Sequence, residues 1–307
     1  MGSKKNGEVQ HHGIHAFIHM GDAKSVEKIL EIDPSQAMME MTGANTLYHA
    51  GSKGRLDIVK IIVEKHPSMI KLMTGPSGYR AHPLYGAAIE GHLPVVKYLV
   101  EAGADVNCIA EDGGSCLIMA VQYNHLDIMT YLLDHQANID YERPGGRGTA
   151  LHLAIITESY RRASPMSPPS PVFLLLLARG ANMELTIKND GDHSPMTALR
   201  MALGCDFRLS MELYASGALL ENIHNNSPLN EREKSTYELF KKRSKTYIQE
   251  QCTAIDAKNA REAPPPTAPL QPNISPHLLS IYMKARCNLV DCEFSKGTGN
   301  VGEFSLS

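Results

Sequence analysis

The chain contains no tryptophan, and aromatic residues make up only 6% of its 307 residues. Its hydrophobic fraction of 43% still supports a core, which must therefore consist mainly of aliphatic side chains and methionine. The longest apolar run, Val172 to Ala178, is far too short to cross a bilayer. A net charge of −3 offers no general attraction for phosphate backbones. We therefore expect a cytoplasmic chain that binds neither membranes nor nucleic acids.

Chemistry-bearing motifs are also scarce. Six cysteines are present without the spacing of a secreted disulfide framework, and the pair Cys287 and Cys292 lacks the neighbouring ligands of a zinc site. His15 and His19 stand one helical turn apart, but no carboxylate or thiol completes a metal site. Neither GxxxxGK[ST] nor GxGxxG occurs. We expect no enzyme, no metal and no cofactor.

What the sequence does contain is an internal repeat. Corresponding leucine or isoleucine residues recur with separations of 33, 37, 33, 34 and 48 residues, at Ile14, Leu47, Leu84, Leu117, Leu151 and Leu199. A fixed period of this length is typical of stacked repeat architectures, in which each unit buries its apolar face against its neighbours.

Each copy predicts two short helices joined by a turn. In the clearest copy, His82 to Asn107, small residues fill the first helix, and Pro94 begins the second. The second helix places apolar residues on one face, and Gly103 follows where a left-handed C-cap is expected. Helices this short are not stable alone, so stacking must supply the core.

These motifs resemble the ankyrin repeat. Thr149 to Ala154 reads TALHLA, close to the family signature Thr-Pro-Leu-His-x-Ala, and residues 91–107 are nearly consensus. The resemblance implies an all-α solenoid of helix-turn-helix units with β-hairpin loops, comprising six repeats and a degenerate C-terminal capping unit. We expect the units at residues 13–40, 41–73, 77–109, 110–142, 144–188 and 193–222, and the cap at 228–256.

Several segments depart from this pattern. Gln136 occupies the cap-glycine position of the fourth unit, where a side chain costs about 1 kcal/mol in left-handed geometry. Units one and two replace the hairpin sequence with the more apolar DPSQAMMEM and HPSMIKLM, which favours packing over partner contact. Ten extra residues enter unit five, in an insertion at 158–170 between its two helices, so the following leucine run is that unit's buried second helix.

The ends of the chain fall outside the repeats. We expect a flexible N-terminus at residues 1–12, a proline-rich linker at 257–276, and a tail at 277–307 with one short helix. Within the insertion, the Ser-Pro pairs and an Arg-Arg-Ala-Ser run mark candidate phosphorylation sites at Ser164, Ser167 and Ser170. A merely tolerated loop is the competing interpretation.

The resemblance also implies where binding occurs. Family histidines on the first helix and at the turn have structural duties, which we assign to His49, His92, His125 and His152. The exposed side of the first helices and the hairpin tips line a concave face. The family's variable positions on that face fall at Ser52, Lys53, Tyr79, Arg80, Glu90, Asp112, Gln122, Tyr123 and Arg147.

We therefore expect a non-catalytic, monomeric interaction module that binds a partner protein through this face. Its irregular repeats resemble ankyrin proteins that intracellular bacteria secrete into host cells, which would place it in the host cytosol. A eukaryotic cytosolic or nuclear adaptor fits the sequence as well. The alternative class is an enzyme or toxin whose repeats position a C-terminal active segment containing Cys287 or Cys292.

Overall fold

The computed structural model describes residues 13–41, 43–75, 80–160, 169–189, 192–205, 207–216, 218, 229, 233–235, 237–240, 242–243 and 253. These residues belong to two compact units, which we describe separately. The first unit extends to Thr157 and includes Ser170–Arg179, and the second contains Glu158–Pro169 and the chain from Gly180 onwards.

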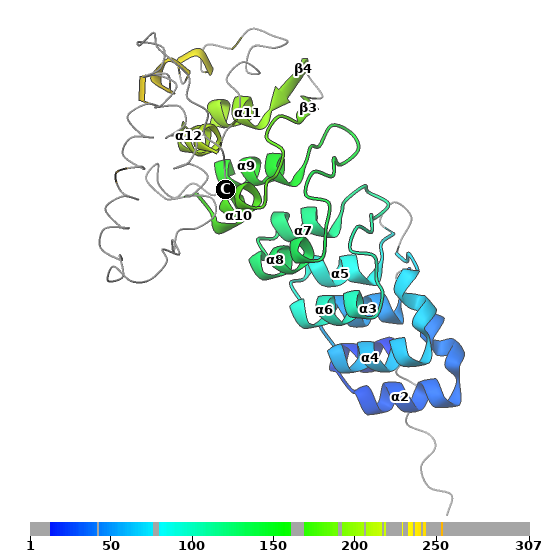
Figure 1. The fold of residues 1–307 in the computed structure, drawn as a ribbon. Helices are drawn as coiled ribbons and strands as arrows, with labels where there is room; N and C mark the ends of the chain where they lie inside the picture. The colour runs from blue at the N-terminus through cyan, green and yellow to red at the C-terminus, as the bar shows by residue number, and fades with distance from the viewer. Residues whose placement is uncertain are drawn as a thin grey trace, which may run out of the picture. The chain divides into compact units, whose positions relative to one another are not determined.

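The first unit is a stack of helix pairs (Figure 1). The first helices of the pairs are packed in a row in which α1 contacts α3, α3 contacts α5 and α5 contacts α7, and the second helices form a parallel row from α2 through α4, α6 and α8 to α10. The pairs are α1 (Ile14–Met20) with α2 (Ala23–Ile32), α3 (Thr46–Ser52) with α4 (Leu56–Lys65), α5 (Pro83–Ile89) with α6 (Leu93–Glu101), α7 (Cys116–Gln122) with α8 (Leu126–Asp134), and α9 (Ala150–Tyr160) with α10 (Pro171–Ala178).

The helix pair α5–α6 shows how the sequence pattern produces the stack. The apolar face of α6 is buried through Val95, Val96 and Leu99, as its spacing predicts. Gly86 lets α5 approach α3, because an added Cβ there would lie 3.0 Å from the ring of Tyr48. Each buried valine or leucine contributes about 1.5–3 kcal/mol. Most of this burial is possible only between neighbouring pairs.

The turn inside each pair is held by the next pair. Gly91 has a φ of 81°, and an added Cβ would lie 2.5 Å from Cε1 of His125. The Nε2 of His125 donates to the Ile89 carbonyl oxygen at 2.8 Å. One repeat earlier, the Nε2 of His92 makes the same kind of bond to the Ser52 carbonyl oxygen at 3.1 Å. Both turn histidines therefore have the structural role expected from the sequence.

Other residues take the place of the turn histidine between the first two pairs and at the start of the second helix in the fifth pair. Arg55 stands in for histidine between the first two pairs, and its Nη2 donates to the His19 carbonyl oxygen at 2.7 Å. In the fifth pair the N-cap of α10 is Ser170, whose Oγ accepts from the Phe173 backbone N–H at 3.3 Å. In the fourth pair, the turn between α7 and α8 has Asn124 at φ 62° in place of the glycine.

The leucine run after the insertion belongs to α10. Leu176 and Leu177 are buried, while Leu174 and Leu175 are half-buried. The helix is anchored to its neighbour by an ion pair between Arg179 and Asp134 at 2.6 Å. The predicted second helix is therefore present, with only part of the run in the core.

Two short 3-10 helices form in the segments of the first two repeats that lack the usual hairpin sequence. They are η1 (Pro34–Met38) and η2 (Pro67–Lys71). In η2 Met69 and Ile70 are buried, as we expected of an apolar segment. After η1, by contrast, the strands β1 (Glu40–Met41) and β2 (Ala44–Asn45) pair as a small antiparallel hairpin whose Met41 is exposed.

From Gly180 onwards, the second unit contains an antiparallel hairpin, β3 (Thr186–Asn189) and β4 (Asp192–Thr197), followed by α11 (Ala198–Cys205) and α12 (Phe207–Ala215). Arg200 and Glu233 form an ion pair at 3.6 Å with both side chains 5% exposed. Phe240 is fully buried and meets the ring of Tyr214 edge-on at 5.2 Å between centroids. These contacts attach the helical residues 233–235 and 237–240 to the helices α11 and α12.

A buried histidine pair joins the first two repeats. The Nδ1 atoms of His15 and His49 lie 3.0 Å apart, and the Nε2 of His15 lies 3.0 Å from the Met39 carbonyl oxygen. The carbonyl can only accept, so His15 carries its proton on Nε2 and its Nδ1 accepts from the Nδ1–H of His49. Protonation of both rings would set two N–H donors against each other and break this bond. Burial lowers the pKa of His15, and it lowers the pKa of His49 to about 4, with further help from the charge of His15.

The C-cap of α8 carries the strain that the sequence predicts. Gln136 has a φ of 65°, whereas the equivalent Gly103 after α6 has a φ of 95° and open space around it. The side chain of Gln136 is exposed, and the hydrogen bond at this cap uses its backbone instead. The side-chain amide of Asn107 donates to the Gln136 carbonyl oxygen at 3.3 Å.

We expect Gln136→Gly to raise the free energy of unfolding by about 0.5–1 kcal/mol, because glycine adopts left-handed geometry without steric cost. The reciprocal variant Gly103→Gln should lower it by about 1 kcal/mol or more. Urea unfolding followed by circular dichroism measures both. A destabilised Gln136→Gly variant would contradict this explanation of the cap.

We expect the His15–His49 pair to make the protein acid-sensitive. The folded-state pKa values lie below the unfolded value of about 6.5, so the unfolded chain binds more protons as the pH falls. The stability is complete above about pH 6.5 and declines towards pH 4. Between pH 7.5 and pH 5 the loss should be about 1–2 kcal/mol, allowing for partial solvent screening.

The double variant His15→Gln/His49→Gln should be less stable at pH 7.5 but should lose less stability on acidification. His135→Gln is the control, because that exposed ring only bonds the Tyr131 carbonyl of its own helix. Thermal unfolding at a series of pH values provides the comparison. Equal pH dependence of the double variant and the wild type would rule out the pair as the cause.

Candidate functional site

The predicted binding face has two parts in the first unit. One part is a row of residues at the C-terminal ends of the first helices, where α3, α5 and α7 each end before their turn. The other part is a set of loops between repeats, which we call fingers. The third-to-fourth finger spans residues 109–115, and the fourth-to-fifth spans residues 143–148, each closed by an antiparallel bridge between its end residues.

The helix-end row contains mostly exposed side chains. Lys53, Glu90, Gln122 and Tyr123 are exposed, and Tyr123 is 49% accessible. The Tyr123 ring lies nearly parallel to that of His125, with the centroids 6.4 Å apart and the planes at 21°. Since His125 is itself fixed by the Ile89 carbonyl, Tyr123 is an aromatic side chain beside a fixed ring. Ser52 is half-buried, and its Oγ donates to the His49 carbonyl oxygen at 3.1 Å.

The fingers are linked to one another by a network around Asp112. Its carboxylate accepts from the Gly114 backbone N–H at 2.9 Å and from the Tyr85 hydroxyl at 3.3 Å, and it forms an ion pair with Arg143 of the next finger. Burial raises the pKa of Tyr85, and the charge of Asp112 raises it further, so the phenol stays protonated as a donor. Asp112 therefore has a structural role in aligning two fingers.

Arg80, next to the Thr74–Ala81 bridge of the preceding repeat, is linked to the 109–115 finger. Its backbone N–H donates to Oε2 of Glu111 at 3.1 Å, and the Glu111 N–H donates back to the Arg80 carbonyl at 2.8 Å. The exposed guanidinium also donates to the Met73 carbonyl at 3.2 Å. Arg147 is exposed in the 143–148 finger. Tyr79 lies outside the described residues.

The predicted face therefore divides by role. Lys53, Glu90, Gln122, Tyr123 and Arg147 present exposed side chains, whereas Ser52, Arg80 and Asp112 take part in hydrogen bonds within the chain. Sequence reasoning missed Tyr85 and Arg143, which hold Asp112. Their signal was weak, because partners 27 and 31 residues apart meet only once the repeats are stacked.

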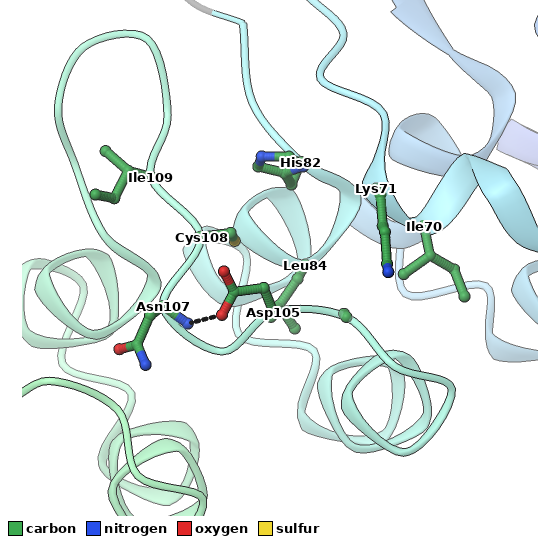
Figure 2. Close-up of a pocket in the computed structure, with 9 residues that line it drawn as sticks. Ile70, Lys71, His82, Leu84, Asp105, Asn107, Cys108 and Ile109 are labelled. Carbon is green, nitrogen blue, oxygen red and sulfur yellow. Dashed lines mark hydrogen bonds between the residues drawn. The ribbon is translucent and has the colours of Figure 1, made fainter.

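A cleft of about 490 Å³ lies at the base of the 109–115 finger, between η2 and the loop after α6. Figure 2 shows Ile70 and Lys71 on one side of it and Asn107, Cys108 and Ile109 on the other. Burial lowers the pKa of His82, which lies beside this cleft, although its bond to the Lys71 backbone and the nearby Asp105 oppose that effect. The sequence signal for the cleft was the replacement of the usual hairpin by HPSMIKLM, which forms η2 instead.

The remaining candidates for chemistry are the serines of the insertion, the C-terminal cysteines and His15. Ser170 caps α10, while Ser164, Ser167, Cys287 and Cys292 lie outside the described residues. His15 is engaged with His49, and no group of three histidine, cysteine, aspartate or glutamate side chains that could hold a metal ion occurs within the described residues. None of the helices in that part of the chain has the length and apolarity needed to cross a membrane.

Comparisons with known proteins agree with this architecture. The family model for ankyrin repeats, in three copies, matches residues 13–110 and again residues 84–187. The crystal structure of the human ASB11 ankyrin repeat domain superposes with a TM-score of 0.53 at 20% identity, covering 73% of this chain and 96% of that one. At this identity the likeness shows the fold alone.

Two curated proteins share part of the sequence. Transient receptor potential cation channel subfamily A member 1 of Drosophila melanogaster is 27% identical over 144 residues, which are 47% of this chain. Probable E3 ubiquitin-protein ligase XBOS32 of Oryza sativa subsp. japonica is 31% identical over 110 residues, which are 36% of this chain. The matched region spans only 12% and 22% of these relatives, respectively. The family match extends over more than half of the residues and agrees with the stacked helix pairs, so the chain belongs to the ankyrin-repeat family.

Proposed function

We propose that the protein is a non-catalytic interaction module that binds a partner protein through its helix-end row and fingers. Ankyrin repeats are in general protein-interaction modules, and a fold of stacked helix pairs provides a long, preformed surface. The observation that carries the proposal is the position of Tyr123, which is 49% exposed at the C-terminal end of α7 beside the ring of His125. Tyrosine is enriched among residues that dominate interface energies.

The chemistry of the surface favours a partner with mixed charges around an apolar or aromatic centre. Lys53 and Arg147 supply positive charge, Glu90 supplies negative charge, and Gln122 and Tyr123 offer hydrogen bonds beside the aromatic ring. The ion pair between Asp112 and Arg143 links two neighbouring fingers and restrains them relative to each other. A rigid surface binds with less loss of conformational freedom. From the sequence, we also propose that the protein acts as a secreted effector or as a eukaryotic adaptor. In either role it would be a monomer in the cytoplasm.

We expect Tyr123→Ala to weaken partner binding by about tenfold or more, since an interface tyrosine typically contributes over 1 kcal/mol. The double variant Tyr79→Ala/Tyr123→Ala should weaken it further. The measurement is affinity capture with the full chain, followed by titration of each captured protein against the wild type and the variants.

Tyr131→Ala is the matched control, because that tyrosine lies on α8, in the row of second helices, beneath Lys97 at 5.7 Å from the ring centroid. It should leave binding unchanged. Identical affinities for the wild type and both Tyr123 variants, or an equal loss in the control, would show that binding uses a different face.

A further inference from the structure

Two buried cysteines face each other at the base of the 109–115 finger. The Sγ atoms of Cys108 and Cys116 lie 3.4 Å apart. Ile109 pairs with Ser115 in an antiparallel bridge, and the Ala110 N–H donates to the Gly114 carbonyl at 2.9 Å. Cys108 and Cys116, the first residue of α7, flank this bridge on its outer side.

This placement suits a disulfide. The bridge between Ile109 and Ser115 holds the flanking residues Cys108 and Cys116 close together. The two sulfur atoms need to approach only from 3.4 Å to the bond length of about 2.05 Å.

The two thiols differ in access. Cys108 is 6% exposed and is one of the residues that line the 490 Å³ cleft shown in Figure 2. Cys116 is fully buried behind it. The hydrogen bond to Cys108 and burial both raise the pKa of the Cys116 thiol, which keeps it protonated. Cys108 is therefore the sulfur that meets an oxidant first, and Cys116 is the nearest group that can react next.

We propose that Cys108 is an oxidant-reactive site and that Cys116 resolves it, giving a reversible disulfide that closes the base of the finger. The oxidant is a hydroperoxide. The Cys108 thiol loses its proton and its sulfur attacks a peroxide oxygen; the O–O bond breaks, leaving a sulfenic acid and, with hydrogen peroxide, one water molecule. The Cys116 sulfur then attacks the Cys108 sulfur, the S–O bond breaks, and the hydroxyl leaves as water with the Cys116 proton. Two thiols are oxidised and one peroxide is reduced.

The finger that the disulfide would close carries the linking residues of the candidate face. Glu111 bonds the backbone of Arg80, and Asp112 holds Arg143. A covalent closure at residues 108 and 116 would therefore restrain the loop that holds its neighbouring fingers. The chemistry of the two cysteines does not depend on the proposed partner binding.

The test uses the full reduced chain treated with hydrogen peroxide, blocked with an alkylating agent and mapped by mass spectrometry without reduction. Proteolysis after Glu111 separates the two cysteines, so their peptides stay linked only if the disulfide has formed. We expect this linked pair, the loss of two alkylatable thiols, and recovery of both after dithiothreitol. Cys205, which lies half-buried in the second unit, is the internal reference for general oxidation.

Two variants define the order of reaction. In Cys116→Ser, peroxide should leave Cys108 as a sulfenic acid that dimedone traps, and in Cys108→Ser, Cys116 should stay a thiol. Circular dichroism establishes that each variant is folded, and the wild-type map stands without them. Free alkylation of both Cys108 and Cys116 when Cys205 is already oxidised, or a link from Cys108 to a different cysteine, would overturn the proposal.

Discussion

A contact repeated between the first four helix pairs couples each of them to the next. A glycine in left-handed geometry turns the chain between the two helices, and the side chain of the following repeat fills the space that a Cβ would need. The same side chain donates to the last carbonyl of the first helix in the preceding pair, as His92 does to Ser52 and His125 does to Ile89. Each contact has two effects. It fills the space beside the glycine of the turn, and it gives a carbonyl at the helix end a hydrogen-bond donor.

The position of the candidate face follows from this coupling. Because the helices bury their apolar sides against neighbouring pairs, the ends of the inner helices stay open to solvent beside the turns. Tyr123 is exposed there next to His125, whose ring is fixed by its bond to the preceding repeat. The fingers are aligned separately by the hydrogen bonds of Asp112 and Glu111. The candidate face therefore combines exposed side chains with residues such as Asp112 that also hold neighbouring repeats together.

Much of the fold was predictable because the repeat is local. The spacing of Val95, Val96 and Leu99 predicted the buried face of α6, and the cap position of Gln136 predicted its positive φ. The 3-10 helices η1 and η2 were not predicted, because only the absence of the usual hairpin sequence marked them. The Asp112–Arg143 ion pair and the Cys108–Cys116 contact depend on the stacking of repeats and on the register of a finger. Neither property has a local sequence signal.

The coupling between repeats is tested most directly by hydrogen–deuterium exchange of the full chain, comparing the wild type with His125→Ala. If the contact joins two repeats, the variant should lose protection in α5 and its turn, which lie in the preceding repeat, as well as in α8. His135→Ala, whose ring bonds only its own helix, should leave α5 unchanged. Faster exchange confined to α8, with α5 as protected as in the wild type, would contradict the account.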